Sequence, residues 1–225
     1  FCHFIHKYMH MENVRKQSRF VLAAASLFCA SVISVGLLGA CEKSVPTASD
    51  SNADMVIENI MTRTSIRAFT DQPVDTATVE KILRAGMAAP TAVNKQPWAF
   101  VVVNDRQQME RLRQVHPYAQ MLKTAQLAII VCGDMERALS GFAQAYWIQD
   151  ASAATENILL AAHGLGLGAV WCGVYPNPDV LPKVKEVLGL PSNVIPLNII
   201  PLGYPAESPA PKDKWKPENI HYGKW

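Results

Sequence analysis

The sequence lacks the local motifs that mark several large enzyme classes. It contains no P-loop, no His-Glu-x-x-His zinc motif and no Gly-x-Ser-x-Gly nucleophile elbow. Its cysteines form no Cys-x-x-Cys pair and no zinc-ligand spacing. There are also no internal repeats. We therefore expect no metal site, and no nucleophile can be assigned from a motif.

The chain also lacks an excess of charge of either sign. Lys and Arg number 21 and Asp and Glu 19, which gives a formal net charge of +2. Residues 1–40 carry four of these basic residues and one of these acids, so the remainder has 17 against 18 and a net charge of −1. The slight basicity belongs to the N-terminus, and nothing predicts a nucleic-acid partner.

The first forty residues form a segment of their own. Arg15, Lys16 and Arg19 precede an uncharged apolar run over 20–38, and small residues lead to Cys41. This pattern resembles a bacterial lipoprotein signal, in which Cys41 is the lipidation site. The alternative is an uncleaved transmembrane anchor, because the run is nearly long enough to span a bilayer. Met11 or Met9 is the favoured start, which makes residues 1–10 a misannotated extension.

A lipoprotein signal predicts a lipid anchor in the bacterial cell envelope, with the domain facing the periplasm or the exterior. If the leader is not genuine, the protein is cytoplasmic. Cys2 and Cys29 leave with the leader, so Cys132 and Cys172 are the thiols of the domain. Both lie in apolar, strand-like runs, and we expect two buried free thiols. A disulfide between them is the alternative in an oxidising compartment.

The rest of the chain reads as a tether followed by one domain. Residues 41–53 comprise the lipidated cysteine and a flexible Ser-, Ala-, Thr- and Asp-rich tether, and residues 54–225 form the domain. Hydrophobic periodicity and capping residues predict alternating helices and strands. The predicted helices are 54–61, one capped by Asp75, one capped by Asp105, 142–163, and one running from Asn177-Pro178 to Gly189. The predicted strands are 99–104, 127–132, 169–174 and 194–202.

Strands separated by helices predict an α+β fold with a mixed central sheet flanked by helices. Pro196 and Pro201 place the last strand at an edge or at the periphery of the sheet. Gly164 to Gly168 follow a helix and precede a strand, the reverse of a dinucleotide-binding loop, so we interpret them as a helix stop and turn. The tail 206–225 contains Trp215, Ile220, Tyr222 and Trp225, and we expect it to lie across another surface.

The loop from Pro90 to Trp98 is the most informative stretch. Its two prolines prevent regular helix, and an apolar strand follows it directly. Thr91, Asn94 and Gln96 supply groups that donate and accept hydrogen bonds, as a planar ligand requires. Arg63, Ser65 and Arg67 form a second polar cluster suited to a phosphate, and Lys212 and Lys214 add positive charge. For each cluster alone, a solvated surface or a loop cap is the favoured interpretation.

Four blocks together resemble the signature of the nitroreductase family. They occur in the family's order and span about Val56 to Lys214. They are Arg63-Thr64-Ser65-Ile66-Arg67-Ala68-Phe69, the loop Pro90-Thr91-Ala92-Val93-Asn94-Lys95-Gln96-Pro97-Trp98, Ala161-Ala162-His163 with the glycines to Gly168, and Pro201-Leu202-Gly203-Tyr204-Pro205. The resemblance implies a homodimer with a wrapping C-terminal tail that binds one FMN per subunit at the dimer interface.

The resemblance also implies roles for residues of this chain. Arg63, Thr64 and Ser65 match the phosphate-binding turn, and Arg67 matches the residue near the pyrimidine edge. Pro90, Thr91, Ala92 and Asn94 would reach the flavin of the partner subunit. Trp171, Cys172 and Gly173 match the backbone that offers N–H groups near the redox-active nitrogen, and Lys212 and Lys214 match the late basic position. Gln96 and Trp98 are interpreted as structural, and no side-chain acid or base is assigned.

The resemblance implies an FMN-dependent oxidoreductase with no catalytic side chain, because the flavin carries the chemistry. It would reduce nitroaromatics, quinones or similar acceptors by ping-pong hydride transfer from NAD(P)H. The alternatives are a membrane-anchored, flavin-binding electron carrier with little NAD(P)H turnover, and a lipoprotein that has lost flavin and serves as an interaction module.

Overall fold

The structure is a computed structural model that describes residues 48–225. The chain divides into a unit of residues 1–45 and a unit of residues 46–225, and only the second is described. The leader, the lipidation site at Cys41 and the start of the tether therefore lie outside the described residues. Within residues 48–225, no helix combines the length and apolarity needed to cross a bilayer.

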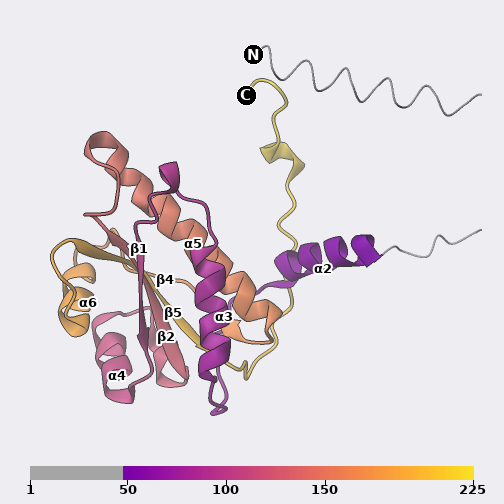
Figure 1. Ribbon diagram of the computed structural model, residues 1–225. Coiled ribbons are helices and arrows are strands. Elements are labelled where there is room, and N and C mark those ends of the chain that lie inside the picture. Colours follow the sequence, from indigo (N-terminus) through magenta and orange to yellow (C-terminus); the bar gives the residue numbers. More distant parts are fainter. Residues whose placement is uncertain (1–47) are drawn as a thin grey trace, which may run out of the picture. The chain divides into compact units, whose positions relative to one another are not determined.

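A five-stranded sheet forms the centre of the described unit (Figure 1). Its main path runs β1 (Trp98–Val103), β2 (Leu127–Asp134), β5 (Val194–Gly203) and β3 (Gly168–Ala169). The short strand β4 (Cys172–Gly173) also pairs with β5. Every pairing between these strands is antiparallel. The α+β class predicted from the sequence is confirmed.

The prediction that the last strand lies at the edge is wrong, because β5 sits between β2 and the β3/β4 edge. Each proline occupies a place where the ladder is already irregular. Pro196 lies opposite Cys132, directly after a register shift in the β2–β5 pairing. Pro201 pairs with Ala128 of β2 on one side, and on the other side it faces the gap between β3 and β4, where no bridge forms. A central strand thus tolerates prolines at positions that give no ladder hydrogen bond.

Helices cover both faces of the sheet, which is why β2 is apolar along its length. Alternate residues of β2 enter different cores: Ala128, Ile130 and Cys132 on one face, and Leu127, Ile129 and Val131 on the other. The first core is closed by α4 (Arg106–Val115), the 3₁₀ turn η2 (Gln120–Lys123) and α6 (Leu181–Leu188). The second is closed by α3 (Thr76–Met87) and α5 (Tyr146–Gly164), as Figure 1 shows.

Local signals set most of the helix ends. Asp75 accepts from Thr78 N–H at 2.8 Å and Asp105 from Gln108 N–H at 2.7 Å, so both predicted N-caps are confirmed. Gly189 ends α6 in the left-handed conformation with φ 62°. Two predicted starts are wrong: α5 begins after the 3₁₀ turn η3 (Gly141–Ala145), and α6 begins at Leu181 after a turn. Close packing of α3 on α5 requires Gly86, whose added Cβ would lie 2.9 Å from Ile158 Cγ1.

Helix α2 (Ala48–Thr62) and the C-terminal tail leave much of their apolar surface exposed. The helix begins earlier than the predicted Asp54, so the last residues of the expected tether are helical. Its Met61 is 65% exposed, and Trp215 and Trp225 of the tail are 70% and 101% exposed. Figure 1 shows the tail, including the short turn η4 (Pro217–Asn219), running away from the sheet. Every residue from 206 to 225 is exposed, so the tail is not packed into a core of its own subunit, although several residues from 209 to 215 border a cavity there.

Candidate active site

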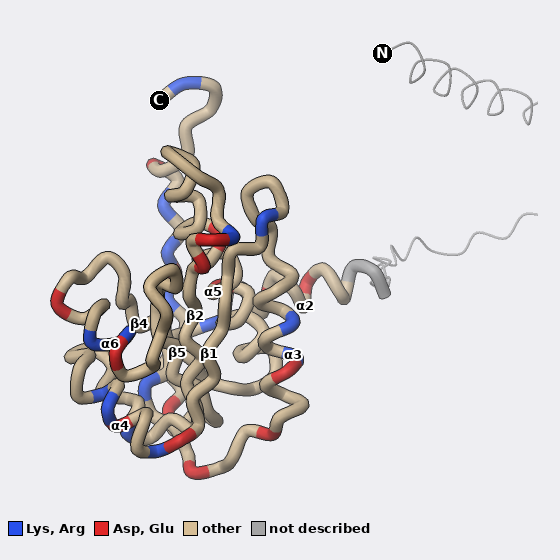
Figure 2. Tube along the Cα trace, turned by 60° about the vertical axis from the view of Figure 1, so that its left-hand side comes forward, with Lys and Arg blue, Asp and Glu red and all other residues tan. Residues whose placement is uncertain are grey.

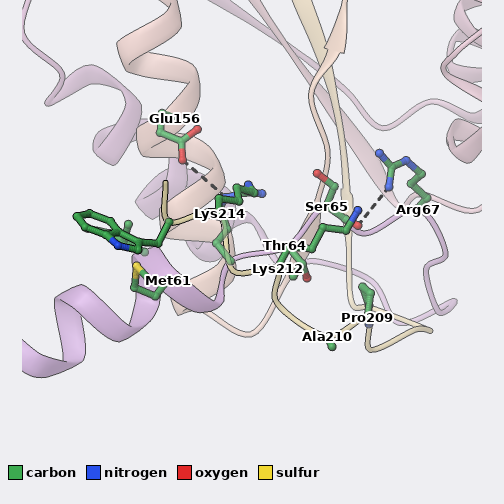
Figure 3. Close-up of a pocket in the computed structure, with 12 residues that line it drawn as sticks. Met61, Thr64, Ser65, Arg67, Glu156, Pro209, Ala210, Lys212 and Lys214 are labelled. Atoms are coloured by element: carbon green, nitrogen blue, oxygen red, sulfur yellow. Dashed lines mark hydrogen bonds and ion pairs between the residues drawn. The ribbon is translucent and has the colours of Figure 1, made fainter. Parts of the chain in front are cut away.

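A cavity of about 660 Å³ brings together the first and last predicted clusters. Side chains from the end of α2, from the segment after it, from α5 and from the tail line it (Figure 3). Among its lining residues are all six that the sequence marks at the two ends of the domain: Arg63, Thr64, Ser65, Arg67, Lys212 and Lys214. Four cationic side chains around one space create a site for an anion.

The segment 63–67 is held by its one buried side chain. Ile66 is 8% exposed and its N–H donates to Ala169 O of β3 at 3.1 Å. Gly168 of β3 is required here, since an added Cβ would lie 2.6 Å from Ile66 Cγ2. Because neighbouring side chains of an extended segment point to opposite sides, Ser65 and Arg67 face the cavity while Ile66 enters the core (Figure 3).

Two carboxylates that the sequence reading did not single out adjoin this cationic cluster. Glu156 on α5 lies in the cavity and forms an ion pair with Arg63, with Nε and Oε1 3.7 Å apart. Glu207 at the start of the tail accepts from the backbone N–H groups of Arg67 and Ala68, which fixes the path of the tail toward the cavity. Neither glutamate stands out in the sequence, because each lies far along the chain from its partner.

Figure 2 shows the basic residues of the tail in blue, along the stretch that leads to the C-terminus. Lys212 and Lys214 belong to this stretch, and Figure 3 places them beside Thr64 and Ser65. The two clusters are nearly 150 residues apart in sequence, and the tail must fold back past β5 for them to meet. Only the tertiary structure establishes that they share one cavity.

The outer edge of β3 and β4 carries backbone groups that point away from β5. Gly173 pairs with Asn198, while Val174 N–H donates to Leu197 O at 2.9 Å. In an antiparallel ladder bonded and non-bonded pairs alternate, so the N–H and C=O of Gly173 point away from β5. Ala169 of β3 likewise directs its carbonyl oxygen away from β5, and this oxygen accepts a hydrogen bond from Ile66 N–H. Gly173 is exposed, whereas Cys172 beside it is buried.

The positive charge of Arg67 acts on the thiol of Cys172 in β4. Burial raises the pKa of the Cys172 thiol to about 11, and the nearby Arg67 guanidinium opposes that increase. Burial raises the pKa of Cys132 to about 12. Both thiols are buried and free, as predicted, and neither forms a disulfide. With such pKa values neither thiol is a nucleophile at neutral pH.

The loop from Pro90 to Trp98 is rigid but does not line the cavity. Asp150 on α5 accepts from Ala92 N–H at 2.8 Å, and Thr91 Oγ1 accepts from Gln96 N–H at 3.1 Å. Gln96 also donates to Asn94 Oδ1 at 2.9 Å, so its bracing role is confirmed, as is the burial of Trp98. Pro90, Thr91, Ala92 and Asn94 are thus not brought to the cavity of their own subunit.

The loop also carries backbone strain. Val93, Asn94 and Gln96 have φ values of 52°, 54° and 49°, and for a β-branched valine this conformation is a true outlier. Val93 is 80% exposed, so no packing of its own side chain explains the strain. Strained backbone of this kind persists where surrounding contacts hold it, commonly at ligand-binding sites. Here the buried Asp150 is such a contact.

No group of three or more His, Cys, Asp or Glu side chains among the described residues could hold a metal ion. The chemistry of the site therefore has to be read from cations, hydroxyls and backbone N–H groups. This donor set suits an anionic, planar ligand with polar edges.

Comparison with known proteins identifies the family. The family model of the nitroreductases matches residues 60–116 and 113–204, which include the segment 63–67, the strained loop and the β3/β4 edge. The chain belongs to the nitroreductase family. A protein of Methanothermobacter thermautotrophicus, provisionally described as NADH dehydrogenase/NAD(P)H nitroreductase, is 48% identical over 171 residues, which cover 76% of this chain and 87% of the relative.

Solved structures agree with this assignment. An FMN-dependent nitroreductase from Clostridium difficile R20291 superposes with a TM-score of 0.69 at 30% identity, covering 75% of this chain and 99% of that one. An NADPH:FMN oxidoreductase from Vibrio harveyi, solved in complex with NAD⁺, has a TM-score of 0.69 at 28% identity and covers 76% of this chain and 77% of that one. The nitroreductase resemblance drawn from the sequence is confirmed, and this chain is an oxidoreductase of that family.

Proposed function

We propose that this nitroreductase binds FMN, takes reducing equivalents from NAD(P)H and passes them to nitroaromatics, quinones or similar acceptors. The observation that carries the proposal is the cavity in which four cationic side chains meet. Relatives named for FMN and NADPH use support it.

The charges of the lining residues fit the phosphate of FMN. Arg63, Ser65 and the two tail lysines would hold the phosphate, because a doubly charged anion requires several donors and cations around it. By the family resemblance Arg67 would approach the pyrimidine edge of the ring, where its charge would favour the anionic reduced form. When bound, FMN supplies the reversible hydride chemistry, and the protein binds and orients it.

The complete site is proposed to need a second copy of the chain. The strained loop does not line the cavity of its own subunit, although its backbone is held rigidly in place. Large apolar side chains of α2 and of the tail remain exposed in the single subunit. A homodimer in which each tail lies on the partner, and each loop reaches the partner's flavin, accounts for both observations.

Anaerobic rapid mixing tests the proposed reaction. The purified protein is loaded with FMN and mixed with NADH or NADPH while flavin absorbance is followed. We expect bleaching with at least one donor, and recovery on addition of a quinone or nitroaromatic, as ping-pong kinetics requires. Bound flavin that neither donor reduces would contradict the proposal and favour the electron carrier. Protein that does not bind FMN at all would favour the interaction module.

The cellular compartment of the protein distinguishes an NAD(P)H-dependent enzyme from a membrane-anchored electron carrier. We propose that Cys41 carries lipid and anchors the domain in the cell envelope, on the strength of the leader pattern. Reduced nicotinamides are not expected outside the cytoplasm, so an exported protein would need another electron donor. Cell fractionation with and without Cys41→Ser tests this. If the wild-type protein is found in the cytosolic fraction, that result would contradict the proposed lipid anchor, and NAD(P)H could then be the electron donor.

A further inference from the structure

Glu207 in the tail connects the two chain segments that supply most of the cations of the cavity. The backbone N–H of Arg67, at the end of the segment 63–67, donates to Glu207 Oε1, and the N–H of Ala68 donates to the same oxygen at 3.2 Å. Within residues 48–225, neither N–H has another acceptor. Two successive N–H groups that converge on one carboxylate oxygen form a charge-assisted contact. The Glu207 side chain therefore ties the tail to the segment 63–67.

The backbone of the tail is paired with the rest of the subunit only as far as Ala206, whose N–H donates to Ala68 O at 2.9 Å. Residues 208–215 are all exposed. In the part of the chain that the structure describes, they form no hydrogen bond or ion pair with any residue outside the tail. Glu207 is therefore the last residue that attaches the tail before Lys212.

The stretch between Glu207 and the tail lysines is stiff. Pro209 and Pro211 each have a fixed φ, and each also disfavours helical backbone in the residue before it. Proline-rich segments of this kind stay extended, with a rise of about 3.1 Å per residue. The direction in which the chain leaves Glu207 therefore determines where Lys212 and Lys214 lie, as it would not in a flexible linker.

Both tail lysines line the cavity, and so does the segment to which Glu207 is bonded. Lys212 and Lys214 share the lining with Ser65, beside which Figure 3 shows them. The segment 63–67 and the tail thus both supply cations to one space, and Glu207 joins them. Cations that are already held in place bind an anion more tightly than the same cations on a free chain, because less conformational entropy is lost on binding.

We propose that Glu207 is a positioning residue that makes the site selective for phosphorylated flavin, FMN over riboflavin, by holding the two tail lysines in the cavity. This inference rests on the proposed function, since it requires the phosphate of FMN to lie there. Glu207 does not line the cavity, so it acts through the lysines. Riboflavin lacks the phosphate and gains nothing from these cations. A comparison of the two flavins therefore separates this role from general support of the fold.

The sign of the effect on FMN binding separates positioning from the charge of the carboxylate. Glu207 brings a negative charge close to the cationic cluster, because its carboxylate is bonded to the backbone of Arg67. If this charge alone acted on the ligand, removing the carboxylate would tighten FMN binding. If the carboxylate positions the lysines, removing it releases the tail and weakens FMN binding instead.

The test uses the full-length chain freed of flavin, and the dissociation constants of FMN and riboflavin are measured by flavin fluorescence. Glu207→Ala removes both hydrogen bonds, and Glu207→Gln keeps an acceptor oxygen without the charge. In Glu207→Ala we expect the constant for FMN to rise about fivefold, as for exposed hydrogen bonds to a charged group, and that for riboflavin to stay unchanged. Glu207→Gln should stay within about twofold of wild type. Glu218→Ala, which removes an equal charge farther along the tail, should change neither constant.

A variant that combines Lys212→Ala with Lys214→Ala provides a second measurement. It should weaken FMN binding less in the Glu207→Ala background than in the wild type, because released lysines contribute less. Equal weakening in both backgrounds would overturn the proposal, as would Glu207→Ala protein that binds FMN no more weakly than wild type, or that loses FMN and riboflavin equally. If Glu207→Ala does not fold, Pro209→Gly with Pro211→Gly replaces it, because both residues are exposed and their loss loosens the same stretch. Wild-type protein that binds no FMN would overturn the proposed function itself, which makes the two failures distinguishable.

Discussion

At the scale of single residues, the cavity depends on cations that are only partly shielded from solvent. Arg67 is exposed, and its side chain makes a single long contact, from Nη1 to Ser65 O at 3.5 Å. Its guanidinium is thus available for a ligand, while its backbone is held by Glu207. We consider it the cation whose removal should affect FMN most selectively, because little of the fold depends on its side chain.

Arg67→Ala should weaken FMN binding about tenfold to a hundredfold, the loss expected for hydrogen bonds to a charged group. Titration of the apoprotein with FMN, followed by flavin fluorescence, measures the dissociation constant. Arg84→Ala is the matched control, since Arg84 pairs with Glu80 on the surface of α3. An unchanged dissociation constant in Arg67→Ala would remove this residue from the site.

Glu156→Gln should have the opposite effect and tighten FMN binding. The Glu156 carboxylate is 52% exposed and competes with a phosphate for Arg63, which is 18% exposed. Because exposed ion pairs contribute about 1 kcal/mol or less, the dissociation constant should fall by up to about fivefold. Glu80→Gln, which removes the exposed partner of Arg84, should leave it unchanged. Weaker binding in Glu156→Gln would show that the carboxylate orders Arg63 for the ligand.

The two thiols of the domain should resist alkylation while the protein is folded. With burial raising the pKa of Cys172 to about 11 and of Cys132 to about 12, little thiolate exists at pH 8. Iodoacetamide treatment at pH 8, followed by peptide mass mapping, should find both unmodified in native protein. Both should be modified in guanidinium chloride, which serves as the control. Labelling of Cys172 in the native state would mean that the β4 edge opens readily.

At the scale of elements, α2 is attached to α5 by side-chain contacts at its end. Thr62 Oγ1 donates to Glu58 O at 2.6 Å, so it accepts from His163 Nε2 at 2.9 Å. Asn59 adds a bond to Leu160 O at 3.1 Å. These bonds hold the C-terminal end of α2 against α5. The other apolar side chains of α2 are exposed in the single subunit and would be available to a partner subunit.

The folded protein should lose stability as the pH falls below about 6.5. Burial, and next the charge of Arg63, lower the pKa of His163 below its ordinary value of 6.5. The unfolded chain therefore takes up this proton first, and stability falls from pH 6.5 down to the lowered pKa of the folded state. Urea denaturation at pH 7.5, 6.5 and 5.5 measures the effect. His163→Gln should show a smaller loss; an identical pH dependence would assign the loss to other groups.

At the scale of the whole molecule, the homodimer proposed above would account for the exposed tail and for the distance between the loop and the cavity of its own subunit. Trp215→Ser with Tyr222→Ser retains both tail lysines while removing large apolar side chains, which are 70% and 91% exposed in the single subunit. Truncating an interface aromatic weakens the free energy of association by about 2 kcal/mol or more. The dissociation constant of the dimer should therefore rise at least about thirtyfold. Light scattering across a dilution series measures it.

Tyr118→Ser is the control for this experiment, because Tyr118 is 77% exposed and lies on another segment. It should leave the dimer unchanged. A protein that is monomeric at all concentrations and still binds FMN tightly would contradict the proposed two-chain site.

The sequence by itself determined the family, the caps of α3 and α4, and six of the residues that line the cavity. Those features are local: an Asp side chain caps the helix that follows it, and family blocks are contiguous. Whether a proline-containing strand lies at an edge is not local, because it depends on which partner groups a proline would leave unpaired. The edge position predicted from Pro196 and Pro201 is therefore wrong. β5 can be a central strand because its pairing with the neighbouring strands is interrupted at both prolines, and its own sequence does not show these interruptions.

Only the tertiary structure decided how distant groups meet. It placed the Lys212 and Lys214 pair with Arg63, put Glu156 in the same cavity, and directed the His116 ring at Gly173. The sequence does not reveal the roles of the buried His116 and Asp150, because the hydrogen-bond partner of each lies about sixty residues away along the chain. The physical reason is that hydrogen bonds and ion pairs act over a few ångströms, whereas the sequence specifies only neighbours along the chain.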